Sequence, residues 1–356
     1  MFQKSKIISV GNLLIELKTG KKTLLIDVRS EKEFEEDHVP GAVNLPVLTN
    51  KEREEVGTLY KKNSFEARRL GARLIAQNVP GILKFIENNA DKDTIIYLYC
   101  WRGGMRSKSL FTVLDLIGYK TFLLDKGYKA YRRFVYDFLK NETFSMITIY
   151  GPSGSGKTAL IESLRADGLS AVNIENLASH KGSLLGGDFE TQPSQKKFES
   201  LLVKSIIEEK LKNNLFFIVE GESRKIGKIN LPFNFYSQMI NGKKIWIELP
   251  LKLRAKRLAE EYENNSNDYI LNKVLLIKKF ISKENYEKLT EYIKRGDKTS
   301  AAEVLLESHY DNYYYKRKKD AFVKEFNFMA WEEIYKEVKE FLSKTTDKNE
   351  PIFKIG

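Results

Sequence analysis

The single cysteine of the chain, Cys100, stands in a sequence that could activate a sulfur nucleophile. It follows an apolar, β-branched segment, Thr94–Tyr99, and is followed by the letters WRGGMRS. The glycines Gly103 and Gly104 allow the backbone to curl so that successive N–H groups point at one anion. The loop opens a predicted helix, and a helix N-terminus favours negative charge. We expect these donors to favour a thiolate at Cys100, the nucleophilic form of cysteine.

The residues that follow the cysteine form a candidate anion loop, consisting of Trp101, Arg102, Gly103, Gly104, Met105 and Arg106. The two arginines add positive charge, so the loop could also hold a persulfide, a perselenide or a phosphate oxygen. A structural alternative is a buried cysteine at the end of a strand. The spacing from Cys100 to Arg106 also fits the CxxxxxR pattern of cysteine-dependent phosphatases, although Tyr99 stands where tyrosine phosphatases carry a histidine.

A second motif matches the phosphate-binding pattern GxxxxGK[ST] and lies between a predicted strand, Ser145–Tyr150, and a predicted helix, Lys157–Arg165. It consists of Gly151, Pro152, Ser153, Gly154, Ser155, Gly156, Lys157 and Thr158. The backbone N–H groups of such a loop wrap a diphosphate, the lysine adds a charge and the threonine can bind Mg²⁺. The same cradle suits ATP, GTP or another diphosphate.

Acidic residues after the next predicted strand are candidates for a metal site. Glu220 ends the segment Leu215–Glu220, where P-loop proteins often carry an acid that binds Mg²⁺, and Glu222 is close by. Thr158 and Glu220 are therefore candidate metal ligands, while the structural alternative is that Glu220 caps its strand. The three histidines are scattered and there is one cysteine, which excludes a Cys-rich zinc site.

Short apolar segments alternate with helical patterns, which favours parallel α/β sheets. We expect two domains, residues 1–140 and 141–356, the second with a helical extension from about residue 251. Further strands are predicted at Thr23–Val28, Thr121–Leu124 and Lys244–Leu249. Further helices are predicted at 51–89 with an interruption near Pro80, Met105–Ile117, Lys129–Leu139 and Ser194–Lys212.

The composition fits a folded chain with an anionic partner. Of 356 residues, 60 are basic and 48 acidic, and the excess is denser in residues 1–140, which carry 25 basic and 17 acidic side chains. This balance favours nucleic acid or phosphate, although a solvated basic face would look the same. Apolar runs are too short to span a bilayer and no signal peptide is evident, so we expect a soluble, cytoplasmic protein without membrane contact.

Several stretches resemble known families. Asp27–Pro46 is similar to the N-terminal signature of a rhodanese domain. The CWRGGMRS loop is more specific and resembles the active loop of the bacterial tRNA 2-selenouridine synthases. Supporting similarity is found at Glu52–Lys61, Gly127–Phe134 and Ile174–Gly187 and extends over roughly the first 250 residues. The resemblance implies a rhodanese-like domain followed by a P-loop NTPase-like domain.

The resemblance also implies an activity, the replacement of sulfur by selenium in the wobble 2-thiouridine of tRNA. Geranyl diphosphate held at Gly151–Thr158 would first alkylate the sulfur, and selenium from selenophosphate would then be delivered, with Cys100 carrying or activating it. The implied partners are tRNA and an enzyme that supplies selenophosphate, with no tightly bound cofactor. A candidate substrate loop is formed by His180, Lys181, Gly182 and Ser183, where the family pattern has arginine in the second position.

The sequence is also compatible with two other functions. One is an ATP-driven kinase or NTPase with a regulatory rhodanese-like module, and the other is a cysteine-dependent phosphatase with a nucleotide-binding domain. Leu231–Met239 could line a geranyl pocket or form a core helix. Tyr310–Lys319 interleaves aromatic and basic residues and could stack bases, or it could be a solvated helix with its tyrosines packed beneath.

Overall fold

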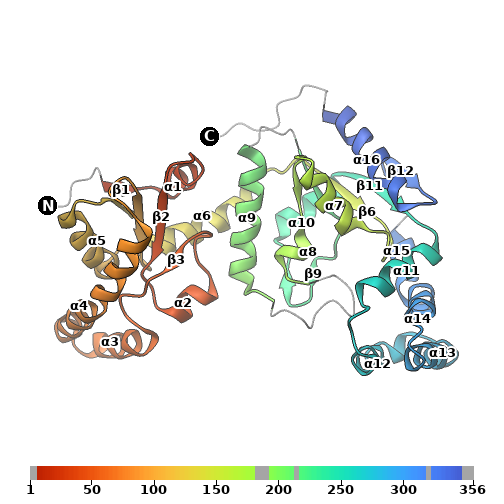
Figure 1. Ribbon diagram of the computed structural model, residues 1–356, viewed down its shortest axis with the longest axis horizontal. Helices are drawn as coiled ribbons and strands as arrows, with labels where there is room; N and C mark the ends of the chain where they lie inside the picture. Colours follow the sequence, from red (N-terminus) through yellow and green to blue (C-terminus); the bar gives the residue numbers. More distant parts are fainter. Residues whose placement is uncertain (1–5, 181–191, 212–215, 318–321, 347–356) are drawn as a thin grey trace. The chain divides into compact units, whose positions relative to one another are not determined.

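The computed structural model describes residues 6–180, 192–211, 216–317 and 322–346. The chain divides into two compact units, one formed by residues up to Phe138 together with Glu199–Leu201, and the other by the remainder. Each unit contains a five-stranded sheet whose strand pairs are all parallel (Figure 1). The α/β fold class predicted from the sequence is therefore confirmed.

The sheet of the first unit has the strand order β1-β5-β4-β2-β3. Its strands are β1 (Ile7–Ile8), β2 (Thr23–Asp27), β3 (Val43–Asn44), β4 (Ile95–Tyr99) and β5 (Lys120–Leu124). Its helices are α1 (Val10–Glu16), α2 (Glu31–Glu36), α3 (Asn50–Lys62), α4 (Ser64–Asn89), α5 (Met105–Ile117) and α6 (Gly127–Asn141). The central strand β4 delivers Cys100 to the carboxyl edge of the sheet, where parallel α/β proteins place their ligands.

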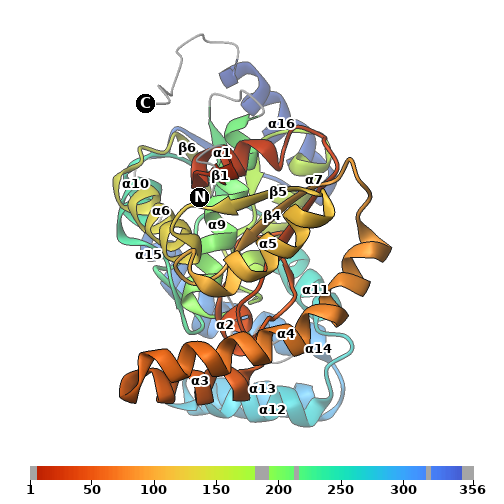
Figure 2. The same ribbon diagram turned by 90° about the vertical axis from the view of Figure 1, so that its left-hand side faces the viewer.

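The core of this unit lies between the sheet and helices α4 and α5. Ile96 and Leu98 of β4, Ile86 of α4 and Leu110 and Leu114 of α5 are all fully buried. The helices α3 and α4 form an antiparallel pair that lies side by side (Figure 2). Helix α5, which follows the loop that carries Cys100, packs against α4 and against strands β4 and β5.

The helical region after residue 50 is interrupted at a different place from the one predicted. The sequence suggested a break near Pro80, but α4 continues through Pro80, and the break between α3 and α4 is at Asn63. The Asn63 side chain accepts hydrogen bonds from the N–H groups of Phe65 and Glu66, so it caps the N-terminus of α4. Tertiary packing of Ile75, Ile82 and Ile86 sustains the helix on both sides of the proline.

The sheet of the second unit has the order β12-β11-β6-β8-β7. Its strands are β6 (Met146–Tyr150), β7 (Ala171–Val172), β8 (Phe217–Glu220), β11 (Lys243–Glu248) and β12 (Lys324–Asn327), and β9 (Lys225–Ile226) pairs with β10 (Ile229–Asn230) in a separate hairpin. The first helices are α7 (Lys157–Ala166), α8 (Ile174–Leu177), α9 (Gln195–Leu211) and α10 (Phe233–Asn241). Helix α10 buries Phe235 and Met239 completely, which confirms the core-helix alternative for this segment.

The region after residue 251 is mostly helical, as predicted, but it also contains an edge strand that the sequence did not reveal. The helices are α11 (Leu251–Glu261), α12 (Asn267–Leu275), α13 (Lys283–Lys294), α14 (Lys298–Leu305), α15 (Asp311–Arg317) and α16 (Trp331–Thr346). Strand β12 pairs with β11, and its Phe326 is buried in the sheet core. In the part of the chain that the structure describes, no helix is both long and apolar enough to cross a membrane.

Candidate active sites

The sulfur of Cys100 is held by two neutral hydrogen-bond donors from the start of α5. The backbone N–H of Gly104 and the hydroxyl of Ser107 each donate to Sγ over 3.2 Å. Gly103 has a φ of 65°, a left-handed conformation that turns the loop toward the sulfur. Cys100 is 3% exposed, but it also lines a cavity that is described below. Amide and hydroxyl donors of this kind stabilise a thiolate.

The start of α6 supports the cysteine loop from behind. The backbone N–H of Tyr128 donates to the carbonyl oxygen of Cys100 over 2.8 Å, and that of Lys129 donates to Trp101 over 2.9 Å. Gly127 has a φ of 58°, and a Cβ at this position would overlap the Cys100 carbonyl and lie 2.7 Å from the nitrogen of Gly103. Only glycine fits this close approach, so Gly127 is a positioning residue that the sequence analysis did not single out.

A buried ion pair fixes the edge of the sheet beside this loop. Arg29, 1% exposed, donates to both carboxylate oxygens of Asp27 and to the carbonyl of Asp37. Its guanidinium lies 3.8 Å from the ring centroid of Tyr128. Burial alone would disfavour the charge of Arg29, but the hydrogen bonds and charge of Asp27 outweigh it and raise the pKa of Arg29. Asp27 and Arg29 therefore have a structural role at this edge.

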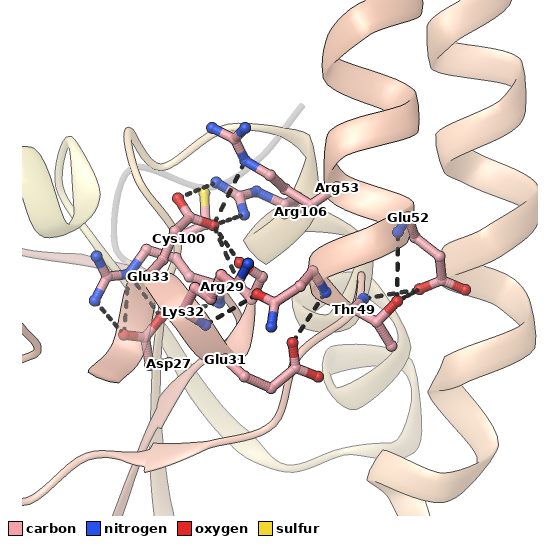
Figure 3. A network of polar contacts seen from close by, with 12 residues as sticks. Asp27, Arg29, Glu31, Lys32, Glu33, Thr49, Glu52, Arg53, Cys100 and Arg106 are labelled. Atoms are coloured by element: carbon pink, nitrogen blue, oxygen red, sulfur yellow. Dashed lines mark hydrogen bonds and ion pairs between the residues drawn. The ribbon is translucent and has the colours of Figure 1, made fainter. Parts of the chain in front are cut away.

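The charge of Arg106 is matched by a carboxylate from α2. Arg106 donates to both oxygens of Glu33, over 2.6 and 3.3 Å, and Arg53 of α3 approaches the same carboxylate at 3.9 Å (Figure 3). Burial raises the pKa of Glu33, but the hydrogen bonds and charge of Arg106 outweigh it and hold that pKa below its usual range. The exposed Arg102 has no such carboxylate partner among the described residues. Glu33 and Arg53 were not predicted as site residues.

Cys100 opens onto a cavity of about 500 Å³ between its own loop and the helices α3 and α4. Trp101, Arg102, Gly104, Met105 and Arg106 of the predicted anion loop all line it. Val56, Tyr60 and Ile75 supply apolar surface from the two helices. The thiol is thus surrounded by protein on most sides and still faces a space that a substrate can enter.

The phosphate-binding loop follows β6 and begins α7, as the sequence predicted. Gly156 has a φ of 80°, and a Cβ there would overlap the ring of Trp331 and lie 2.9 Å from Arg257. Lys157 is 8% exposed, and its ammonium group donates to the carbonyls of Gly151 and Pro152 over 2.9 and 3.4 Å. The buried hydroxyl of Ser155 has no hydrogen-bond partner among the described residues, and Ser155 does not line the cavity in front of the loop.

Two carboxylates face this loop across a cavity of about 290 Å³, which Glu175 and Glu222 line together with Lys157 and Thr158. The hydroxyl of Thr158 donates to Glu175 over 2.9 Å. Burial, and then the charge of Glu222, raises the pKa of Glu175 to about 8. A Mg²⁺ ion held by one or two carboxylates and by substrate phosphates fits this donor set. Within the described ranges there is no cluster of three His, Cys, Asp or Glu side chains that could hold a metal without a substrate.

Glu220, which the sequence predicts as a candidate metal ligand, has a different position. It is fully buried and does not line the cavity, and its carboxylate accepts the backbone N–H of Glu175 over 2.7 Å at the start of α8. Burial is the main cause that raises its pKa to about 8. Glu220 therefore holds α8, and with it Glu175, against the loop. Glu175 lies in the segment Ile174–Gly187, which resembles the family, but it is part of no recognised motif, so the sequence did not identify it as a site residue.

The remaining candidates are only partly described. His180 is half-buried just after α8, and burial lowers its pKa, whereas Lys181, Gly182 and Ser183 lie outside the described residues. In the strip Tyr310–Lys319, Tyr314 lines the phosphate-loop cavity and Tyr315 donates to Glu248 over 2.6 Å. Tyr314 is half-buried at this cavity, which fits a helix with a tyrosine packed beneath it, whereas Tyr315 is 37% exposed. Lys318 and Lys319 of the strip lie outside the described residues.

Comparison with known proteins gives consistent matches for both units. A family model described as "tRNA 2-selenouridine synthase AAA domain" matches residues 144–349, and one described as "Rhodanese-like domain" matches residues 12–134. Curated proteins named tRNA 2-selenouridine synthase are also similar to this chain. The one from Nitrosomonas eutropha is 38% identical over 251 residues, which is 67% of this chain and 63% of that protein.

Two further relatives carry the same name. The protein from Bdellovibrio bacteriovorus is 36% identical over 255 residues, covering 68% of this chain and 65% of the relative. The protein from Shewanella sp. (strain ANA-3) is 30% identical over 326 residues, covering 82% of this chain and 87% of the relative. The aligned part of the chain thus spans less than two thirds of the Nitrosomonas and Bdellovibrio proteins but most of the Shewanella protein.

Proposed function

This chain belongs to the tRNA 2-selenouridine synthase family, and from that membership we propose that it is an enzyme that replaces sulfur by selenium in the wobble 2-thiouridine of tRNA. The reaction proceeds in two steps. The sulfur is first alkylated by geranyl diphosphate, and the alkylated sulfur is then displaced by selenium from selenophosphate. The sites described above support one step each.

The phosphate-binding loop is assigned to the first step. The diphosphate of geranyl diphosphate binds the backbone N–H groups of the Gly151–Thr158 loop and the Lys157 ammonium. Thr158, Glu175 and Glu222 would hold a Mg²⁺ ion here together with the phosphates, and the ion would neutralise charge on the diphosphate. The thiouridine sulfur attacks the first carbon of the geranyl chain, the carbon–oxygen bond breaks, and diphosphate leaves.

The geranyl chain binds in the same cavity as the diphosphate. Leu258, Tyr262 and Tyr314 line it beside the phosphate loop, and burial of methylene groups against such side chains stabilises binding. This arrangement replaces Leu231–Met239 as a candidate geranyl pocket, because the side chains of Phe235 and Met239 are sealed in the core.

Cys100 is assigned to the second step. Selenophosphate carries selenium in its fully reduced form, so a sulfur–selenium bond on Cys100 would require an oxidant. We therefore assign Cys100 the activation of the donor: its thiolate takes the phosphoryl group, and the selenium leaves as selenide. Selenide attacks C2 of the nucleobase, geranyl thiolate leaves, and water hydrolyses the cysteine–phosphate bond to release phosphate.

The observation that carries this proposal is the environment of the sulfur. Cys100 is the one cysteine of the chain, and its sulfur accepts an amide and a hydroxyl hydrogen bond while facing an open cavity. A structural cysteine at a strand end would need none of these features. The arrangement is that of a nucleophile prepared for an anionic donor.

Mass spectrometry of tRNA nucleosides tests the proposal with two variants. Cys100→Ser should abolish selenouridine and leave S-geranyl-2-thiouridine to accumulate, because only the second step needs the thiolate. Lys157→Ala should reduce both products, since it weakens the diphosphate site. The matched control is Lys225→Ala, an exposed lysine of the same unit, which should behave as the wild type.

Other outcomes would support another function. Normal selenouridine from the Cys100→Ser variant would remove the thiol from the mechanism. Nucleotide hydrolysis unaffected by Cys100→Ser would favour an NTPase, and turnover of a phosphate monoester lost in that variant would favour a phosphatase.

A further inference from the structure

The cavity beside Cys100 has a chemical character different from that of the phosphate-loop cavity. Acidic side chains, including Glu162, Glu175, Glu222 and Glu261, line the phosphate-loop cavity together with Lys157. The larger cavity beside Cys100 has no acidic residue in its lining, and its surface is mostly apolar. A site for a small reduced anion alone would need neither this size nor this apolar surface.

The apolar surface comes from one side of the α3–α4 pair. Val56 and Tyr60 of α3 and Ala72 and Ile75 of α4 line the cavity, and Met105 adds to the surface from the start of α5. Tyr60 and Met105 are 58% and 52% exposed, although both are large apolar side chains. Exposed apolar surface that continues into a cavity marks a binding site for an apolar group.

Arginines surround this surface. Arg53, Arg68, Arg102 and Arg106 all line the cavity. One carboxylate, Glu33, contacts Arg106 and approaches Arg53 at 3.9 Å. With four guanidinium groups against this one carboxylate, the cavity fits an occupant that is apolar in the middle and anionic at its edges. Arginine is well suited to such contacts because its planar fork matches phosphate oxygens.

We propose that this cavity binds the alkylated nucleotide of the RNA, with the geranyl chain on the apolar surface of α3 and α4 and the neighbouring backbone phosphates on the arginines. This proposal rests on the proposed function and adds a leaving-group site for its second step. The thioether sulfur then lies at the Cys100 end of the cavity. Displacement breaks the bond between C2 and the geranyl sulfur, and the geranyl thiolate remains in the apolar cavity until it is released.

The site binds the substrate of the second step more tightly than its product. Each buried methylene group stabilises binding by about 0.8 kcal/mol in the limit of full burial, so the alkylated RNA binds more tightly than the same RNA with 2-thiouridine or selenouridine. The substrate of the second step is therefore retained, and its product, which lacks the chain, is released. Without the chain, the RNA keeps only its phosphate contacts with the arginines.

Binding of two synthetic RNAs to the full chain tests this inference. The probes are anticodon stem-loops that differ at the wobble base, one with S-geranyl-2-thiouridine and the other with 2-thiouridine. The wild type should bind the geranylated RNA at least about tenfold more tightly, which corresponds to about 1.4 kcal/mol. Ala72→Phe fills the cavity from an exposed position of α4 and should remove most of this preference. Ala76→Phe, on the same helix and outside the cavity, should retain it.

A second measurement does not depend on any substitution. Cys100 is the one cysteine, so its alkylation by iodoacetamide can be followed by intact mass. The geranylated RNA should protect Cys100 more strongly than the 2-thiouridine RNA at equal occupancy. Equal protection, or a preference for the geranylated RNA that survives Ala72→Phe, would overturn the proposed leaving-group site.

Failure of the site and failure of the function give different results. If the wild type, supplied with selenophosphate, converts the geranylated RNA to selenouridine RNA and Ala72→Phe does so with the same KM, the function stands and the leaving-group site is wrong. If the wild type binds the geranylated RNA preferentially but forms no selenouridine, the site stands and the proposed function is wrong.

Discussion

At the scale of single residues, the environment of Cys100 depends more on neutral donors than on the flanking arginines. The sulfur accepts from the Gly104 N–H and the Ser107 hydroxyl, whereas the Arg106 guanidinium is paired with Glu33. Fixed dipoles next to a sulfur act without a counterion and keep their orientation during the reaction. Arg106 therefore orders the edge of the loop, and the amide and hydroxyl act directly on the nucleophile.

The loop position depends on Gly127, and this gives a prediction. Gly127→Ala should displace the Cys100 carbonyl, because the added Cβ overlaps it. We expect the free energy of unfolding to fall by about 2 kcal/mol or more, and selenouridine formation to be largely lost. Urea denaturation and nucleoside analysis are the measurements.

A second glycine serves as a control that separates the steric overlap of the added Cβ from the cost of a left-handed backbone. Gly118 also has a positive φ, of 105°, but a Cβ there would meet nothing within 4 Å. Gly118→Ala should therefore cost only the left-handed backbone penalty of about 1 kcal/mol and leave selenouridine formation intact. Equal loss of activity in both variants would contradict the positioning role of Gly127.

The ion pair between Glu33 and Arg106 should make stability depend on pH. The pKa of Glu33 is lowered in the folded state, so its contribution is complete above the unfolded pKa and is lost as the pH falls through the folded one. We expect Glu33→Gln to destabilise the protein by about 1 kcal/mol at about pH 7 and by much less at about pH 3. Urea denaturation at both pH values measures this, with Glu35→Gln, an exposed neighbour, as the control. If Glu33→Gln lowers the free energy of unfolding by the same amount at both pH values, the ion pair does not make stability depend on pH.

At the scale of elements, the sequence predicted strands and helices correctly where the hydrophobic periodicity and a known motif agreed. The strand before each functional loop and the helix after it were predicted within a residue or two, because a buried strand followed by a glycine-rich loop and an amphipathic helix has a strong local pattern. Edge strand β12 was missed because its residues, Lys324–Asn327, carry charge at the exposed positions and become a strand only by pairing with β11.

Residues that act on a functional loop from a distance were not predictable in the same way. Gly127 faces Cys100 from the start of α6, and Glu175 reaches Thr158 from α8. No local spacing connects either pair, because the contacts arise only when the parallel strands align their carboxyl ends. Cys100 and the residues Gly151–Thr158 could be identified from sequence because each motif contains its own backbone donors.

The uninterrupted helix α4 gives a prediction at this scale. Pro80 has no N–H group and therefore leaves one backbone carbonyl of the preceding turn without its helical partner. Pro80→Ala should restore this bond, and we expect the free energy of unfolding to rise by about 1 to 3 kcal/mol. Urea denaturation measures this change, and the slope of the free energy of unfolding against urea concentration should stay the same. A loss of stability would show that the helix needs the proline to pack against the sheet.

At the scale of the whole molecule, the charge is distributed unevenly. The chain carries a net charge of +12, and residues 1–140 supply the greater part of it. In the same region, four arginines line the cavity beside Cys100, and two of them, Arg53 and Arg106, share the single carboxylate of Glu33. Charge that gathers at the site of a polyanionic substrate both steers association and holds the complex.

This distribution predicts a strong dependence of tRNA binding on salt. Each phosphate contact releases counterions, so the affinity should fall about a thousandfold or more between about 50 and 200 mM salt if six or more phosphates are contacted.

Arg68→Gln, at the cavity, should lower the slope of log affinity against log salt by about one. Arg73→Gln, exposed on the same helix but outside the cavity, should leave it nearly unchanged. Filter binding across a salt series measures both slopes. A wild-type affinity that is flat with salt would contradict a binding mode based on phosphate contacts, and equal slopes for the two variants would place those contacts away from the Cys100 cavity.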